Sequence, residues 1–237
     1  MKQGAIFDMD GLLFDTERMY GEGWDSAADA FGVERSAEFK TAVAGTNGAT
    51  MLHVIHHYYP GIDARRFMEH CLNEVAERTK DGPPMKPGVR EILGFFRERG
   101  VKTAVASSTA LVQIKRNLRL TALEPHFDAV ASGQEVDHGK PAPDVFLLAA
   151  ERIGVAPENC YVFEDGINGM RAAFAAGCAG VMIPDQFQPT PDVMEQAAGI
   201  YASLNDAIAA IQNAIVADGG IDLNGHALYV GGVVYRG

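Results

Sequence analysis

The sequence predicts an α/β protein: a Rossmann-like, doubly wound parallel sheet into which an all-helical domain is inserted. Three observations predict this fold. Short apolar runs recur along the chain, helix-like stretches lie between most of them, and one long segment near the N-terminus has helical patterns without a convincing strand. Strands that alternate with helices are typical of a parallel sheet covered by helices on both faces.

The expected strands are short and rich in Val, Ile, Phe and Ala. Their hydrophobicity is continuous rather than alternating, which is typical of parallel strands buried on both faces. Five runs have this character: Gly4–Phe7, Lys102–Ala106, Asp128–Ala131, Cys160–Phe163 and Gly180–Ile183.

The expected helices of the sheet domain have apolar residues at helical spacing. A glycine stands close to the end of three of them, where it can adopt the left-handed conformation that ends a helix. One of them opens with Pro143 followed by Asp144, a favourable pair for a first turn. The four stretches are Gly88–Arg99, Ala110–Leu120, Pro143–Ile153 and Asn168–Ala176.

The chain is therefore expected to have three parts. Residues 1–14 and 85–217 form the α/β core, and residues 15–84 form the helical domain, with helices near Glu17–Phe31, Ala49–Tyr59 and Ala64–Lys80. A hinge is expected at 82–84, where a Gly-Pro-Pro sequence stands. Residues 218–237 are Gly-rich; a small hairpin and an unstructured tail are both open there, and we assign this tail no function.

Composition excludes several classes of protein. A net charge of −11 and a pI near 5.0 argue against a nucleic-acid partner, which requires a basic surface. The apolar stretch at Ala5–Phe7 is too short for a signal peptide, and no other segment is apolar over a bilayer's thickness. We expect a cytoplasmic protein without membrane contact, and by default a monomer. Its cysteines, Cys71, Cys160 and Cys178, are expected to be free thiols.

Polar side chains stand directly after the predicted strands, where open parallel sheets bind ligands. Asp8 and Asp10 follow the first strand and can share one side of an extended chain. Such a pair can divide the roles of nucleophile and general acid/base, although it also occurs in turns and caps. Ser107, Ser108 and Thr109 follow the second strand and predict either an anion site or a plain helix cap.

Two further clusters complete a pattern. Lys140 stands between turn-forming residues before a helix and can supply a fixed cation, or be an ordinary solvated lysine. Glu164 and Asp165 follow a buried strand, where acids are costly unless paired or metal-bound. Carboxylate oxygens are the hard ligands that Mg²⁺ prefers, so the pair favours a magnesium site. The alternative is that both acids are ordinary surface residues. Together the clusters match the needs of phosphoryl transfer.

Four stretches of the chain resemble the haloacid dehalogenase superfamily of phosphatases, in its branch with a small helical cap. They are Phe7–Glu17, Ala106–Ser108, Gly139–Asp144 and Phe163–Ala173. The resemblance extends over roughly Gly4 to Ile215.

The resemblance implies a role for each site residue. Asp8 would attack phosphorus and become an aspartyl-phosphate, and Asp10 would protonate the leaving alcohol and then activate water. Ser107 would bind the phosphoryl group beside Ser108, and Lys140 would balance charge. Mg²⁺ would be held by the Asp8 and Asp165 carboxylates, by the Asp10 backbone carbonyl, and by Glu164 directly or through water.

The cap is expected to contact the leaving group of a small phosphorylated metabolite, such as a sugar phosphate. The candidates are Tyr20, Trp24, Thr46, Asn47 and His53, each of which can instead be an ordinary cap residue. His53, His56 and His57 are expected to be surface side chains rather than a metal cluster.

A β-phosphoglucomutase-like mutase is the alternative function. Tyr20 stands where those enzymes have His, and the loop Gly45–Gly48 lacks their Arg. Gly166 replaces the usual Ser after the acid pair but removes no expected ligand. A non-catalytic binding module is the third possibility, although it would require loss of acids that are all present.

Overall fold

The structure is a computed structural model that describes residues 2–44, 46, 48–218, 228–230 and 233–235. The chain divides into two compact units, which we call the core unit (Met1–Phe14 with Met85–Gly237) and the helical unit (Asp15–Pro84). No described helix has both the length and the apolarity that a bilayer crossing requires.

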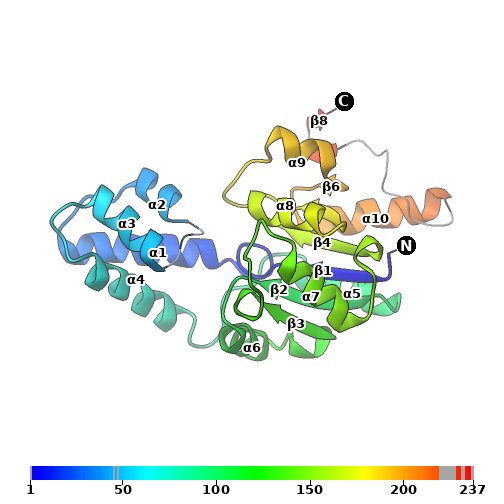
Figure 1. The fold of residues 1–237 in the computed structure, drawn as a ribbon, viewed down its shortest axis with the longest axis horizontal. Helices are drawn as coiled ribbons and strands as arrows, with labels where there is room; N and C mark the ends of the chain where they lie inside the picture. Colours follow the sequence, from blue (N-terminus) through cyan, green and yellow to red (C-terminus); the bar gives the residue numbers. More distant parts are fainter. Residues whose placement is uncertain (1, 45, 47, 219–227, 231–232, 236–237) are drawn as a thin grey trace. The chain divides into compact units, whose positions relative to one another are not determined.

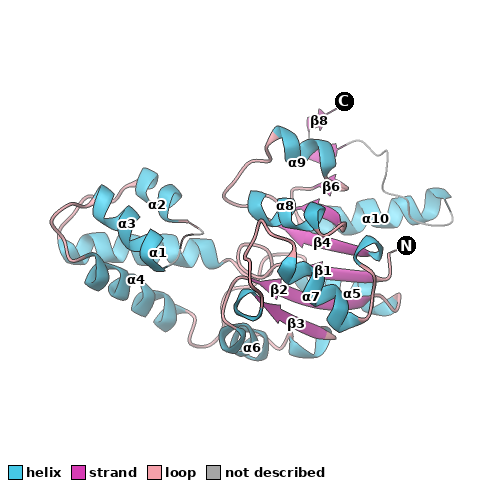
Figure 2. Cartoon of the chain, viewed as in Figure 1, coloured by secondary structure: helices cyan, strands magenta, loops and turns pink. Residues whose placement is uncertain are grey.

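The core unit contains a parallel sheet of six strands in the order β3-β2-β1-β4-β5-β6 (Figures 1 and 2). The first strand of the chain lies near the middle, as in a doubly wound sheet, so the predicted fold class is confirmed. The strands are β1 Gly4–Phe7, β2 Lys102–Ser107, β3 Ala129–Ser132, β4 Cys160–Glu164, β5 Ala179–Met182 and β6 Gly199–Ile200.

Helices cover both faces of this sheet because its strands are apolar on both sides. Phe7 faces one side, where its ring stacks on Phe163 at 4.9 Å, and its neighbour Ile6 faces the other. The Phe7 side is covered by α5 (Val89–Glu98), α6 (Leu111–Leu120) and α10 (Leu204–Asp218). The Ile6 side is covered by α7 (Asp144–Ile153) and α8 (Ile167–Ala175), and α9 (Pro191–Gln196) packs beside α8.

The helical unit has an apolar core of its own. Its centre is Trp24, whose ring stacks on Phe67 at 5.8 Å and meets Phe39 edge to face at 5.3 Å. Asp63 caps the last helix by accepting hydrogen bonds from two backbone N–H groups of the first turn. The helices are α1 Thr16–Phe31, α2 Ala37–Val43, α3 Gly48–Tyr58 and α4 Ala64–Arg78.

Two smaller features complete the description. In the tail, β7 (Leu228–Val230) pairs antiparallel with β8 (Val233–Tyr235), in agreement with the hairpin alternative. All three cysteines are free and buried, as the sequence predicts.

Candidate active site

The candidate site lies at the carboxyl ends of four neighbouring strands. Asp8 follows β1 directly, and its backbone N–H donates to the carbonyl of Phe163 in β4 at 3.0 Å. This bond extends the strand pairing by one residue and fixes the backbone of Asp8 over the sheet edge. Only 6% of Asp8 is exposed, so its carboxylate is largely withdrawn from water.

Lys140 brings a positive charge to this carboxylate from the loop before α7. Its Nζ donates to Asp8 Oδ1 at 2.5 Å and to Glu164 Oε1 at 2.8 Å. A third, longer bond of 3.3 Å reaches the carbonyl oxygen of Ala106 at the end of β2. The side chain is only 9% exposed. The alternative of a solvated surface lysine is therefore wrong.

Three carboxylates gather around the ammonium. Oxygen atoms of Asp8, Glu164 and Asp165 lie within 4.8 Å of one another. Glu164 is 3% exposed, and its second oxygen accepts a 2.7 Å hydrogen bond from the backbone N–H of Gly166. One lysine does not balance three acids, two of them buried and Asp165 half-buried, and hard oxygen ligands are those that Mg²⁺ prefers. The donor set fits a divalent cation.

The electrostatics of the acids also favour a cation site. Burial raises the pKa of Asp8 to about 7; Lys140 acts to lower it, while Glu164 and Asp10 raise it further. Burial and the charges of Glu164 and Asp8 raise the pKa of Asp165 well above its ordinary value. Burial alone would lower the pKa of Lys140, but the carboxylates outweigh it and raise that pKa. Asp8 and Asp165 therefore bind protons more tightly than ordinary carboxyl groups do, and a further cation would favour their charged forms.

Asp10 is not one of these three clustered carboxylates, and its side chain accepts hydrogen bonds from hydroxyls. Its Oδ2 accepts a 2.7 Å hydrogen bond from Thr109 Oγ1 and a 3.3 Å bond from Ser107 Oγ. The backbone N–H of Thr109 donates to Ser107 Oγ at 3.0 Å. The sequence singles out Thr109 with the two serines as an anion site or a helix cap, but it does not predict this contact with Asp10.

Two glycines leave room for the acids. Gly11 has a φ of +83°, and a Cβ there would overlap the Asp165 carboxylate. A Cβ at Gly169, in α8, would overlap the carboxylate of Glu164. Neither glycine was predicted from the sequence, because glycine is common in loops and tolerated in helices whether or not an acid lies against it.

The remaining candidates are Ser108 in the core unit and residues of the helical unit. Ser108 is exposed. Thr46 belongs to the helical unit and donates its hydroxyl to the carbonyl of Val43 at 2.7 Å. Asn47 lies outside the described residues. Trp24 is a core residue of the helical unit, in agreement with the alternative of an ordinary cap residue.

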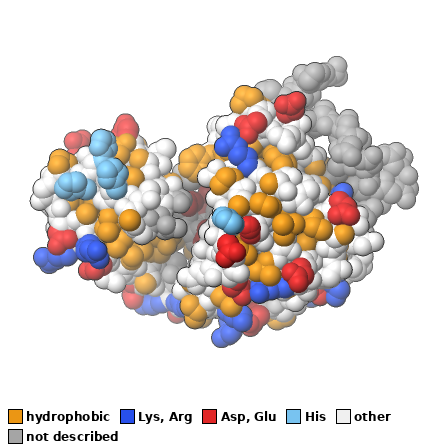
Figure 3. Space-filling model, in the orientation of Figure 1, with side chains coloured by type: hydrophobic (Ala, Val, Ile, Leu, Met, Phe, Trp, Pro, Cys, Tyr) orange, Lys and Arg blue, Asp and Glu red, His pale blue; other side chains and the backbone are white. Residues whose placement is uncertain are grey.

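Of the other helical-unit candidates, Tyr20 is half-buried and packs against the unit's own core. His53, His56 and His57 are exposed, as expected, and Figure 3 shows histidine side chains at the surface of that unit.

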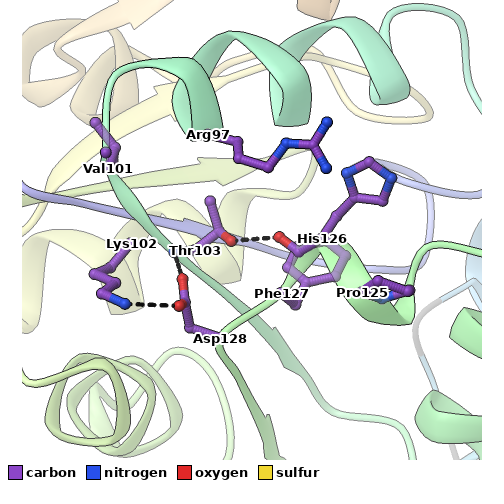
Figure 4. A pocket seen from close by; sticks show the side chains of 9 residues that line it. Arg97, Val101, Lys102, Thr103, Pro125, His126, Phe127 and Asp128 are labelled. Carbon is purple, nitrogen blue, oxygen red and sulfur yellow. Dashed lines mark hydrogen bonds and ion pairs between the residues drawn. The ribbon is translucent and has the colours of Figure 1, made fainter.

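A separate pocket of about 230 Å³ lies at the opposite, amino ends of the strands (Figure 4). Arg97, Lys102 and His126 contribute to its lining. Lys102 is paired with Asp128 at 2.9 Å, and the hydroxyl of Thr103 donates to the carbonyl of His126 at 2.6 Å. None of the predicted site residues lines this pocket.

Comparison with known proteins identifies relatives over most of the chain. The family model for haloacid dehalogenase-like hydrolases matches residues 2–177. A phosphorylated carbohydrates phosphatase of Thermotoga maritima is 32% identical over 219 residues, covering 91% of this chain and 93% of that protein. Hexitol phosphatase B of Escherichia coli K12 is 31% identical over 185 residues, covering 76% of this chain and 82% of that protein.

Solved structures agree with the fold. A crystal structure of a Thermotoga maritima protein assigned to the beta-phosphoglucomutases is 28% identical, with a TM-score of 0.75, and covers 89% of this chain and 99% of that one. A hydrolase of Deinococcus radiodurans, solved with bound phosphate and sodium, has a TM-score of 0.76 at 24% identity. It covers 90% of this chain and 96% of that one, and at this identity it supports the fold alone.

Proposed function

The chain belongs to the haloacid dehalogenase-like hydrolases and is a phosphoric monoester hydrolase, and we propose that it dephosphorylates a small phosphorylated carbohydrate through an aspartyl-phosphate on Asp8. The observation on which this proposal rests is the buried contact of Lys140 with Asp8 and Glu164. A buried acid next to a fixed ammonium at the ligand-binding edge of the sheet is placed to act as a nucleophile toward an anionic group.

In the first step, a carboxylate oxygen of Asp8 forms a bond to phosphorus while the bond to the leaving oxygen breaks. Asp10 donates its proton to that oxygen, so the product leaves as a neutral alcohol. In the second step, Asp10 accepts a proton from water, whose oxygen attacks the same phosphorus. The bond between phosphorus and Asp8 then breaks, which releases phosphate and restores the carboxylate.

The other residues stabilise charge during both steps. Lys140 lies beside the attacking carboxylate and offsets part of the negative charge that the phosphoryl group brings. Ser107 can donate its hydroxyl to a phosphoryl oxygen.

Asp8, Glu164 and Asp165 would hold the divalent cation, for which we propose Mg²⁺. When bound, such a cation neutralises phosphate oxygens and orients them for in-line attack.

The substrate class follows from the relatives. Their names specify phosphorylated carbohydrates, hexitol phosphates and fructose 1-phosphate. We therefore propose a phosphorylated sugar or sugar alcohol as substrate.

The second candidate is a phosphosugar mutase, which the similarity to a structure assigned to the beta-phosphoglucomutases favours. A mutase must hold a second phosphate while its intermediate reorients. The His and the Arg expected to bind that second phosphate are both absent from the sequence, which has Tyr20 at the His position and no Arg in Gly45–Gly48. Hydrolysis is the better-supported function.

A substrate screen tests the proposal. Purified protein with Mg²⁺ is assayed for phosphate release from a panel of phosphorylated sugars and sugar alcohols, with EDTA and Asp8→Asn as controls. Phosphate release that both controls abolish supports the phosphatase. Conversion of β-glucose 1-phosphate to its 6-phosphate isomer without phosphate release would replace it with the mutase. No turnover of any panel member would favour a binding module.

A further inference from the structure

We propose that Thr109 is a positioning residue that holds the acid/base Asp10 through its side chain and the phosphate-binding Ser107 through its backbone. This inference rests on the proposed function, because it assigns Asp10 to proton transfer. From the sequence, Thr109 is expected only as part of an anion site or of a helix cap, and neither role involves Asp10.

The first argument is the geometry at Asp10. Thr109 Oγ1 donates to Asp10 Oδ2 at 2.7 Å, a shorter bond than the 3.3 Å bond from Ser107. Both bonds use the same carboxylate oxygen. No hydrogen bond from the described side chains reaches Oδ1, and Asp10 is partly exposed. The hydroxyl of Thr109 thus fixes one oxygen and leaves the other to exchange a proton with a leaving group or water.

The second argument is that Thr109 is itself held on two sides. Its carbonyl accepts a 2.7 Å hydrogen bond from Ser132 Oγ at the end of β3, and Ser132 is fully buried. Its N–H donates to Ser107 Oγ at 3.0 Å. A chain of contacts therefore runs from β3 through the loop after β2 to the loop after β1. A donor whose own backbone is fixed loses little freedom when it binds a carboxylate.

The third argument concerns Ser107. Its oxygen already accepts from the Thr109 N–H, so its own O–H remains to donate. That O–H faces Asp10 in the structure. When a phosphoryl group arrives, the hydroxyl of Ser107 can turn to it without leaving Asp10 unbonded, because Thr109 keeps its bond. Two neighbouring hydroxyls thus allow one to bind substrate while the other orients the acid.

A plain helix cap does not account for Thr109. The helix α6 begins at Leu111 with Ala110 in the capping position, and no side chain caps it. The hydroxyl of Thr109 is therefore directed to Asp10 rather than to the first turn of the helix.

The test compares Thr109→Val, which removes the hydroxyl at similar volume, with Thr109→Ser, which keeps it. Thr103→Val is the matched control, because Thr103 is a buried threonine at the other end of β2 whose hydroxyl bonds to a backbone carbonyl. Each variant is assayed with a sugar phosphate that the wild type hydrolyses and with p-nitrophenyl phosphate. The second substrate needs little help from an acid, since p-nitrophenolate is a good leaving group.

For Thr109→Val we expect kcat/KM for the sugar phosphate to fall about 10- to 100-fold, part of the roughly 10²- to 10⁴-fold effect of a general acid. The value for p-nitrophenyl phosphate should fall by less than about 3-fold, because kcat/KM reports only the steps up to leaving-group departure. Thr109→Ser should restore most of the loss, and Thr103→Val should leave both substrates unaffected.

Several results would overturn the proposal. They are an equal fall in kcat/KM for both substrates, a fall no larger than in Thr103→Val, and a rise in KM with kcat unchanged, which would make Thr109 a direct substrate contact.

Crystal structures of the wild type and both Thr109 variants give a readout that needs no turnover. Asp10 turned away in the Val variant and kept in the Ser variant supports positioning, and an unmoved Asp10 refutes it. A wild type that hydrolyses no phosphomonoester would count against the proposed function, while the structures would still decide the role of Thr109.

Discussion

The ammonium of Lys140 donates a 2.5 Å hydrogen bond to the carboxylate of Asp8, although 132 residues separate the two in the sequence. The same ammonium is bonded to Glu164. The single positive charge of Lys140 thus stabilises two buried acids.

Lys140→Met keeps the aliphatic chain and removes the charge. We expect turnover to fall by at least about 100-fold, because a preorganised charge at the reacting group is lost. Breaking a buried ion pair should also destabilise the fold by about 3–5 kcal/mol. Kinetics and chemical denaturation measure the two effects. Lys102→Met, which removes an exposed pair with Asp128, is the control and should change little. Unchanged turnover in Lys140→Met would refute the assigned role.

Asp8→Asn should lower turnover by at least about 1,000-fold, as loss of a nucleophile does in other covalent enzymes. The amide is a much poorer nucleophile than the carboxylate. The wild type incubated with substrate and quenched in acid should carry a phosphate that hydroxylamine releases, and the variant should carry none. Turnover of Asp8→Asn near the wild-type rate would exclude the covalent mechanism.

Magnesium should stabilise the fold more at pH 8 than at pH 5. The pKa of Asp8 is raised from 3.8 to about 7, so the metal-free fold binds this proton more tightly than the unfolded chain does. Its contribution to stability is complete below about pH 4 and is lost as the pH rises to about 7. Asp165, whose pKa is also raised, acts in the same direction. A bound cation offsets the burial of these charges and the repulsion between them, which together cause this loss.

The measurement is Tm with Mg²⁺ minus Tm with EDTA across this range. The difference is needed because the pKa of His126 is lowered by burial and by Arg97 and Arg90. The stability that His126 contributes is therefore lost as the pH falls below 6.5, its ordinary pKa. This pH dependence has the opposite sign to that of Asp8, but it does not depend on metal. A Tm difference that is the same at pH 5 and pH 8 would contradict a metal site at these acids.

Gly169→Ala should disrupt the site from within α8. The new Cβ would overlap the Glu164 carboxylate and displace it from Lys140. We expect at least about a 10-fold loss of apparent Mg²⁺ affinity, the scale seen when groups that orient metal ligands are lost. Gly94→Ala is the control, because no heavy atom lies within 4 Å of a Cβ there, and it should stabilise α5 by about 0.5–1 kcal/mol. Metal affinity is read from Mg²⁺ titration of activity and of Tm.

Much of the sheet could be predicted from the sequence because its strands are continuous apolar runs. β1 was predicted with its observed bounds, and the four following strands differ by only one residue at either end. β6 was not predicted, since Gly199–Ile200 is too short to form an apolar run. In the helical unit α2 was missed, because Ala37–Val43 spans only two turns and shows little periodicity.

The site was predicted from polar residues that stand at or near the carboxyl ends of the expected strands. The structure brings four of them together there: Asp8, Lys140, Glu164 and Asp165. The sequence groups Thr109 with Ser107 and Ser108, and its contact with Asp10 was not predicted because adjacent hydroxyl residues before a helix look alike in sequence. Only the direction of the Thr109 side chain, toward Asp10, distinguishes this residue from the exposed Ser108. For Trp24 the sequence left open a core position and a substrate contact, because a large aromatic residue on a helix has the same pattern in both; the structure shows the core position.

The strand order has a consequence for synthesis of the chain. β1 pairs with β2 on one side and with β4 on the other, and β4 ends at Glu164. A nascent chain that has not yet reached residue 164 therefore exposes one edge of β1, with its backbone donors and acceptors unpaired. Such a chain also has Asp8 and Lys140 without Glu164, which ends β4, and Asp165, which follows it. Translation must pass two thirds of the chain before this edge can be closed, so nascent chains shorter than this are the ones that most need a chaperone.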